Sequence, residues 1–167
     1  KDDQMGIDVF EEVVASWLQT NGYFMMNNIK YGHNQEIDIL ATKTASNKII
    51  HIEVTCSSNP VSIIGTKKAG EKDYEQYAIK ELNKKFFNEQ VIDKIKEVTN
   101  QDVEIKRWFI HAKLKEPRQL DTIKSKDIKT IHIKTIIKEI IKSRLNKFSG
   151  DKRLKQLFDI MQEENVE

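Results

Sequence analysis

Two apolar segments that each contain a single acid constrain the fold of this chain more than any other feature. Residues 37–41 hold Asp38 among isoleucine, leucine and alanine, and residues 49–54 hold Glu53 among isoleucine and valine with one histidine. Burying a carboxylate in such a segment is costly unless the carboxylate is paired or binds a metal ion. We therefore expect two neighbouring strands whose acids form a site for a small, hard cation.

The length and composition predict a globular protein with one domain. The 167 residues suffice for a substantial core, and the proportions of charged residues (32%) and hydrophobic residues (38%) are typical of globular chains. We expect residues 1–167 to form a single domain. The apolar runs are too short to cross a bilayer, so we expect no membrane association.

The start of the chain and its cysteine content predict an intracellular, cytoplasmic protein. The chain begins with Lys1-Asp2-Asp3-Gln4, without an initiator methionine or a basic-then-apolar leader. We therefore expect no signal peptide, and a start that was trimmed or a domain that was excised from a larger protein. Cys56 is the one cysteine and forms no internal disulfide, which fits a reducing compartment.

Charge is unevenly distributed along the chain. Residues 1–64 contain four lysines and eight acids, whereas residues 65–167 contain 24 basic and 18 acidic residues. An acidic part that binds a cation, beside a basic part that contacts a phosphate backbone, would produce this asymmetry. A lysine-rich surface exposed to solvent also produces it, and on charge alone this second explanation is the simpler one.

The periodicity of the apolar residues predicts the order of helices and strands. A helix over 6–20 has an apolar face at helical spacing and ends at Asn21-Gly22. The later predicted segments are strands at 23–29, 36–42 and 48–55, a loop at 56–70, a helical region at 71–98 with a break near Asn88, strands at 103–114 and 128–133, and helices at about 136–145 and from 151 onward. This order, αβββαβ with a further strand and helices, predicts an α/β fold with a central mixed sheet flanked by helices.

These segments resemble the PD-(D/E)xK, or restriction-endonuclease-like, nuclease superfamily. The resemblance rests on Gly6–Val14, Asn21-Gly22-Tyr23, Glu36–Ala41 and Ile52–Thr55, and it covers roughly residues 6–135, which leaves about 134–164 as additional C-terminal helices. It implies a restriction-endonuclease-like αβββαβ core and an endonuclease that hydrolyses phosphodiester bonds in DNA with Mg²⁺ or Mn²⁺. Nucleases of this superfamily often dimerise to cut both strands of a DNA duplex, so the resemblance also implies a homodimer as one arrangement of this chain.

The resemblance assigns metal ligands. It implies that Asp38 and Glu53 bind the ion, that the Val54 carbonyl adds an oxygen, and that a glutamate of the first helix completes the site. The residue pattern supports the acid pair, because side chains of like parity on adjacent strands share a face and their oxygens suit Mg²⁺. Such an ion polarises the scissile phosphate and lowers the pKa of a bound water. Glu36 has the parity of Asp38 and is a secondary candidate.

Glu11 and Glu12 compete for the role of the helix glutamate. With Phe10 at zero, Glu11 lies about 100° around the helix, at the edge of the apolar face, and Glu12 lies about 200° around it, pointing away. We therefore predict Glu11 as the acid at the metal site. The alternative is an exposed acid that is stabilised by the N-terminal helix dipole.

Thr55 departs from the superfamily pattern, which has a lysine at this position to orient the water or to stabilise negative charge on phosphorus. Three explanations stay open: a lysine reaches the site from elsewhere, Thr55 and the ion suffice, or the domain no longer cuts. For the first explanation we prefer Lys67, with Lys68 beside it, in the loop after the strand. For the third, the chain is a catalytically inactive module that binds nucleic acid or assembles with protein partners.

Four further residues are secondary candidates. His33 and His51 are candidates for a base or a phosphate contact, although a structural role is the simpler explanation for each. Gln76 and Tyr77, on the next predicted helix, are candidates for approaching the acids, although packing is the simpler explanation for them as well.

Overall fold

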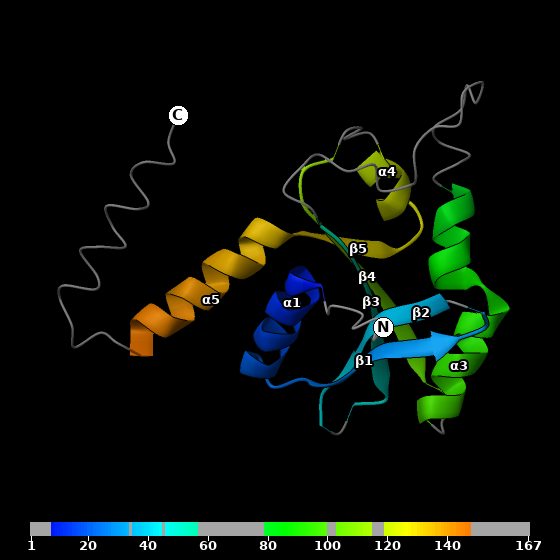
Figure 1. Ribbon diagram of the computed structural model, residues 1–167, viewed down its shortest axis with the longest axis horizontal. Coiled ribbons are helices and arrows are strands. Elements are labelled where there is room, and N and C mark those ends of the chain that lie inside the picture. Colours follow the sequence, from blue (N-terminus) through cyan, green and yellow to red (C-terminus); the bar gives the residue numbers. More distant parts are fainter. Residues whose placement is uncertain are drawn as a thin grey trace, which may run out of the picture.

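The computed structural model describes residues 8–33, 35–44, 46–56, 79–99, 103–114 and 119–147. These residues form an α/β fold in which helices flank both faces of a five-stranded mixed sheet (Figure 1). The predicted α/β class with a central mixed sheet is confirmed.

Helices and strands follow one another along the described residues in an order close to the predicted one. The elements are α1 (Val9–Thr20), β1 (Phe24–Tyr31), β2 (Gln35–Thr42), β3 (Lys48–Thr55), the π-helix η1 (Asn83–Phe87), α3 (Glu89–Thr99), β4 (Glu104–His111), α4 (Gln119–Lys124), β5 (Ile128–His132) and α5 (Ile133–Lys147). Residues 79–82 are also helical and lead directly into η1.

The strands lie in the order β1-β2-β3-β4-β5. The first three are antiparallel neighbours, whereas β3, β4 and β5 are parallel. Parallel neighbours need crossover connections, and these contain η1 and α3 in the first case and α4 in the second. β3 pairs with β4 along its whole length but with β2 only through Ile50–Ile52. The C-terminal end of β3 is therefore open on the side of β2.

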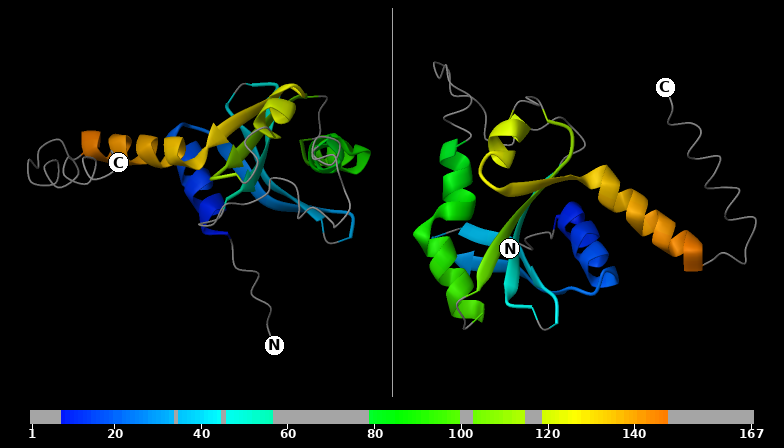
Figure 2. Two further views of the ribbon diagram at one scale, coloured as in Figure 1. Left: turned by 90° about the horizontal axis from the view of Figure 1, so that it is seen from above. Right: turned by 180° about the vertical axis from the view of Figure 1, so that it is seen from behind.

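α1 and α5 cover one face of the sheet (Figure 2). Apolar side chains from both helices and from β3 form the core on this face: Val14, Leu18, Ile50, Ile52, Val54 and Ile136. The two helices are also joined by a hydrogen bond of 2.6 Å from Trp17 Nε1 to Glu139.

η1, α3 and α4 cover the opposite face, where the core consists of two clusters. One contains Leu82, Phe86, Phe109, Ile123 and Ile128, and the other contains Ile37, Leu40, Ile49, Val91 and Ile95. Each fully buried side chain of this size stabilises the fold by roughly 1.5–3 kcal/mol. The helical region after β3 is thereby fixed against the sheet at two separate points.

Most predicted boundaries in the first half agree with the structure. β3 agrees at both ends, β2 begins one residue earlier than predicted, and β1 extends to Tyr31. α1 ends at Thr20, and Gly22 after it has a φ of +76°, as the predicted cap requires. The predicted break near Asn88 is confirmed, because Asn88 is extended and separates η1 from α3.

Two predicted strands are too long at their C-terminal ends. The strand predicted at 103–114 ends at His111, which pairs with Thr55, the last residue of β3, so no partner strand continues beyond it. The strand predicted at 128–133 ends at His132, and α5 begins at Ile133 instead of residue 136. His132 Nδ1 accepts a hydrogen bond of 3.1 Å from the Lys134 amide, which caps the new helix.

Several predicted segments lie outside the described residues: the loop at 57–70, the helical residues 71–78 and the last helix from 151 onward. Within the described part of the chain, no helix has the length and apolar character needed to cross a membrane.

Candidate active site

Asp38 and Glu53 face each other where β2 and β3 separate. The pairing of these strands ends at Ile39 opposite Ile52, and Asp38 and Glu53 are the next residues in register. In place of a backbone contact, Asp38 Oδ2 accepts a hydrogen bond of 2.7 Å from the Val54 amide. The two acids that the sequence indicates therefore lie at one point of the sheet.

β1 is distorted at the same level. Asn28 lies opposite Asp38 and has a φ of +54°. Among residues other than glycine, asparagine tolerates this left-handed conformation best. In β2, Ile39 packs on the α1 side of the sheet, whereas Ile37 packs on the α3 side. The pleat of the β1–β2 pair therefore reverses at Asp38.

Glu53 is buried, with an exposed fraction of 2%, and both of its oxygens have partners. Oε1 lies 2.9 Å from His51 Nε2, and Oε2 lies 2.6 Å from Lys85 Nζ. A carboxylate only accepts hydrogen bonds, so His51 Nε2 is the donor. Burial raises the pKa of the Glu53 carboxyl, but the hydrogen bond from His51 and the charge of Lys85 outweigh burial and bring the pKa below its usual value.

Lys85 reaches the two acids from η1, and the sequence analysis did not identify it. Its side chain is 36% exposed. Burial lowers the pKa of the Lys85 ammonium, but the charges of Glu53 and Asp38 outweigh burial and raise the pKa above its usual value. Lys85 therefore supplies a positive charge that Thr55 lacks.

The preferred lysines, Lys67 and Lys68, lie outside the described residues, as do Gln76 and Tyr77. The sequence does contain a signal for Lys85, because it lies three residues after Leu82 and directly before Phe86, both fully buried. The spacing of apolar residues does not give the direction of the Lys85 side chain, because the π-helical turn departs from the period of 3.6 residues of an α-helix.

Asp38 is surrounded by an excess of negative charge. Burial and the charge of Glu53 raise the pKa of the Asp38 carboxyl to about 8, against the opposing effects of Lys85 and of the Val54 hydrogen bond. The single ammonium thus compensates Glu53 more fully than it compensates Asp38.

Glu11 extends this negative region from the first turn of α1. Its side chain is half-buried, and burial together with the charges of Asp8, Glu36 and Glu53 raises the pKa of its carboxyl. Glu12, its competitor, is exposed. Glu11 is therefore the half-buried glutamate of α1 that lies within electrostatic reach of Glu53. We refer to Asp38, Glu53, Glu11 and Lys85 together as the acid site.

The donor set of the acid site suits a hard cation. Three carboxylates outnumber one ammonium, and a cation would compensate the burial and the charge of Glu53 that together raise the pKa of Asp38. The Val54 amide points toward Asp38, and because a strand residue directs its N–H and C=O to the same neighbour, the Val54 carbonyl faces the same gap. Among the described residues, however, no three His, Cys, Asp or Glu side chains are gathered closely enough to hold a metal ion.

The remaining predicted residues lie around the acid site without joining it. His51 is fully buried, and its ring packs 4.8 Å from that of Phe86, so it positions Glu53 instead of contacting a ligand. His33 is exposed in the turn after β1. Thr55 is half-buried at the end of β3, opposite His111.

Comparisons with known proteins give little further information. No protein-family model matches the chain, and no curated protein matches it. A crystal structure of AF1548, a protein of unknown function, is similar over 75% of this chain, with 14% sequence identity and a TM-score of 0.48. The match covers 58% of the AF1548 chain. A similarity of this degree identifies neither a family nor an activity for the present chain.

Proposed function

We propose that this chain is a Mg²⁺-dependent nuclease-like domain of the PD-(D/E)xK type, with a restriction-endonuclease-like core, that hydrolyses phosphodiester bonds in DNA. One observation carries the proposal: Lys85 Nζ lies 2.6 Å from Glu53, next to Asp38, at the open end of the β2–β3 pair. A helix lysine thereby takes the place of the strand lysine that Thr55 replaces. The order of a helix, three antiparallel strands, a helical crossover and a parallel strand also fits such a core.

In this proposal the carboxylates of Asp38 and Glu53 would hold the metal together with the Val54 carbonyl, and Glu11 would join them only by moving closer than it lies in this structure. When bound, Mg²⁺ supplies polarisation of the scissile phosphate and a lowered pKa of a coordinated water. Lys85 holds its ammonium beside the acids, where it orients the attacking water and stabilises the negative charge that develops on the phosphate oxygens.

A catalytically inactive module that binds nucleic acid or assembles with protein partners is the second candidate. The observation that favours it is that both oxygens of Glu53 already have partners, His51 and Lys85. A carboxylate engaged in this way is a weaker metal ligand than a free one. In this case the acid site stabilises the fold and performs no chemistry.

Cleavage and metal affinity separate the two candidates. The purified chain is incubated with Mg²⁺ or Mn²⁺ and supercoiled plasmid, single-stranded DNA or RNA, while calorimetry measures the affinity for the metal. For a nuclease we expect metal-dependent cleavage that Asp38→Asn abolishes, together with a loss of metal affinity. If no substrate is cut and Asp38→Asn leaves the metal affinity unchanged, the nuclease proposal is wrong. Glu11→Gln should also weaken cleavage, and Glu12→Gln is its matched control, because Glu12 is the exposed neighbour.

Thr55→Lys adds a second comparison. If Lys85 already serves as the catalytic lysine, the added lysine should change an existing activity little. A gain of cleavage in an otherwise inactive chain would indicate a degraded active site. If this variant stays inactive and the chain binds DNA in a salt-dependent manner, the binding module is favoured.

A further inference from the structure

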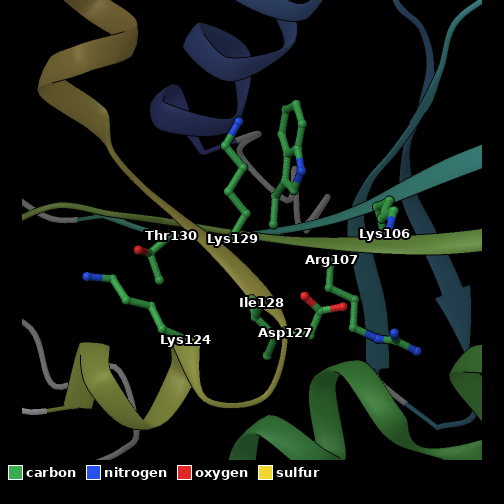
Figure 3. Close-up of a pocket in the computed structure, with 8 residues that line it drawn as sticks. Lys106, Arg107, Lys124, Asp127, Ile128, Lys129 and Thr130 are labelled. Atoms are coloured by element: carbon green, nitrogen blue, oxygen red, sulfur yellow. The ribbon is translucent and has the colours of Figure 1, made fainter.

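A basic pocket lies around the start of β5, on residues that the acid site does not use (Figure 3). Its volume is about 480 Å³, within the range of pockets that hold small ligands. We define it by the charged side chains that line it and by one aromatic ring: Lys106, Arg107, Lys124, Asp127, Lys129 and Trp108. Four of these residues are cationic and one is acidic, so the pocket favours an anion.

Two of the four cations have partners within the protein. Arg107 Nε donates a hydrogen bond of 3.2 Å to the Phe86 carbonyl, and its guanidinium lies 4.3 Å from the centre of the Phe87 ring. Lys106 Nζ lies 2.6 Å from Glu104 Oε1. Arg107 forms a wall of the basic pocket, whereas Lys106 is exposed and its ion pair with Glu104 lies at the surface.

The other two cations, Lys124 and Lys129, are exposed. Neither has an acid within ion-pair distance among the residues for which the structure gives contacts. Lys129 Nζ lies 4.6 Å from the centre of the Trp108 ring, on the face of the sheet that α1 covers, whereas Lys124 belongs to α4 on the opposite face (Figure 3). Both ammonium groups therefore remain available to a ligand.

The aromatic ring indicates which part of a ligand the pocket accepts. Trp108 is contacted by Lys129 and has ring contacts at 6.1 Å with both Trp17 and Tyr23. With these neighbours it does not present a free face on which a base could stack. The basic pocket thus offers positive charge and hydrogen-bond donors, which match the oxygens of a phosphate.

We propose that the basic pocket binds phosphate groups and that Lys124 and Lys129 contact them from opposite sides of the edge of the sheet at β5. The phosphates belong either to the backbone of a nucleic-acid strand or to a free polyphosphate such as that of a nucleotide. In the first case the pocket would hold the substrate strand at a distance from the acid site, and this part of the inference rests on the proposed function.

The test measures binding in the presence of EDTA, so that no cleavage is needed. A fluorescein-labelled oligonucleotide is followed by fluorescence anisotropy over a range of salt concentrations, and inorganic pyrophosphate is titrated by calorimetry. The Lys124→Gln, Lys129→Gln double variant should bind its ligand on the order of tenfold more weakly, with a salt slope smaller by about two. The matched control is Lys138→Gln, Lys142→Gln, which removes the same charge from exposed positions of α5 and should change binding little.

The outcomes separate the two phosphate sources. Weaker oligonucleotide binding with unchanged pyrophosphate binding assigns the pocket to a nucleic-acid backbone, and the reverse assigns it to a free polyphosphate. The inference is overturned if the pocket variant and the control variant lose equal affinity, or if neither ligand binds. The single substitutions, checked by circular dichroism, should each show part of the effect if the double variant does not fold. A failed cleavage assay leaves this binding result intact, so the two proposals fail separately.

Discussion

Lysines serve opposite purposes in the acid site and in the basic pocket. Lys85 is partly buried, with its ammonium 2.6 Å from Glu53, whereas Lys124 and Lys129 are exposed and have no acid partner among the residues with described contacts. A paired cation fixes the position of protein groups, and an unpaired one is available to a ligand. The surroundings of a lysine, more than the number of lysines, therefore indicate where this chain would bind a ligand and where it would react in the proposed function.

Among the changes that test this comparison, we expect the removal of Lys85 from the acid site to have the largest effect. For the proposed nuclease, Lys85→Ala should lower the rate of cleavage by about 10²–10³-fold, because one group that stabilises developing charge is lost. Lys84→Ala, at the exposed neighbour in η1, should leave the rate nearly unchanged. The rates are measured by plasmid nicking under single-turnover conditions. Equal losses in the two variants would mean that Lys85 has no special role.

Glu53→Ala tests the ion pair between Lys85 and Glu53 through the free energy of unfolding. This change leaves the ammonium of Lys85 and the Nε2–H of His51 without their acceptor, so the free energy of unfolding should fall by about 3 kcal/mol. Glu104→Ala is the control, because Glu104 pairs with Lys48 and Lys106 at the surface, where ion pairs contribute little. Urea denaturation measures both. A similar loss in the two variants would contradict a distinction between buried and exposed lysine pairs.

Asp38→Asn tests the excess of carboxylates at the acid site through the pH dependence of the stability of the fold. The pKa of Asp38 is about 8 in the folded protein, above its ordinary value of 3.8, so the native state holds this proton more tightly than the unfolded state does. The resulting stability is complete below pH 3.8 and is lost as the pH rises through 8. Without divalent metal, Asp38→Asn should therefore be more stable than the wild type at pH 9, by roughly 1–2 kcal/mol since the side chain is only half-buried. Thermal melts between pH 4 and pH 9 measure the difference, and a wild type that stays the more stable at pH 9 would contradict it.

The smallest expected effect concerns the backbone, and it too compares the two regions. Among the described residues, the two non-glycine residues with positive φ are Asn28 at the acid site and Asp127 at the basic pocket. Asn28→Ala and Asp127→Ala should each destabilise the fold by about 1 kcal/mol, because alanine disfavours the left-handed conformation. Glycine at either position should cost less than alanine. A larger loss for alanine at 28 than at 127, measured by urea denaturation, would mean that the acid site also depends on the Asn28 side chain.

The features that could be predicted from the sequence are those that depend on local spacing. The single acid in each apolar segment predicts that Asp38 and Glu53 lie on adjacent strands, and the helical angle separates Glu11 from Glu12. The register that sets the two acids opposite each other, and the reversed pleat at Asp38, do not follow from parity. The element order and the break at Asn88 follow from apolar periodicity in the same way.

The remaining features depend on contacts that arise only after folding. β4 ends at His111 because β3 ends opposite it, and no pattern within residues 103–114 contains that information. Lys85 points at the acids from a single π-helical turn, which departs from the period of 3.6 residues that apolar spacing follows. The basic pocket combines residues from β4, β5 and the end of α4, so its cations are not adjacent in the sequence.

The break at Asn88 divides the helical region after β3 into two segments that pack against different parts of the core. Residues before Asn88 pack into the cluster of Phe109, whereas Val91 and Ile95 of α3 pack into the cluster of Ile37. Because η1 and Asn88 separate the two segments, each keeps its own rotational phase against the sheet. Because Lys85 lies between the buried residues Leu82 and Phe86, a single-residue insertion or deletion within η1 would turn Lys85 away from the acids and displace Phe86 from its cluster at the same time. The position of the lysine is therefore tied to the packing of the segment before Asn88 and not to that of α3.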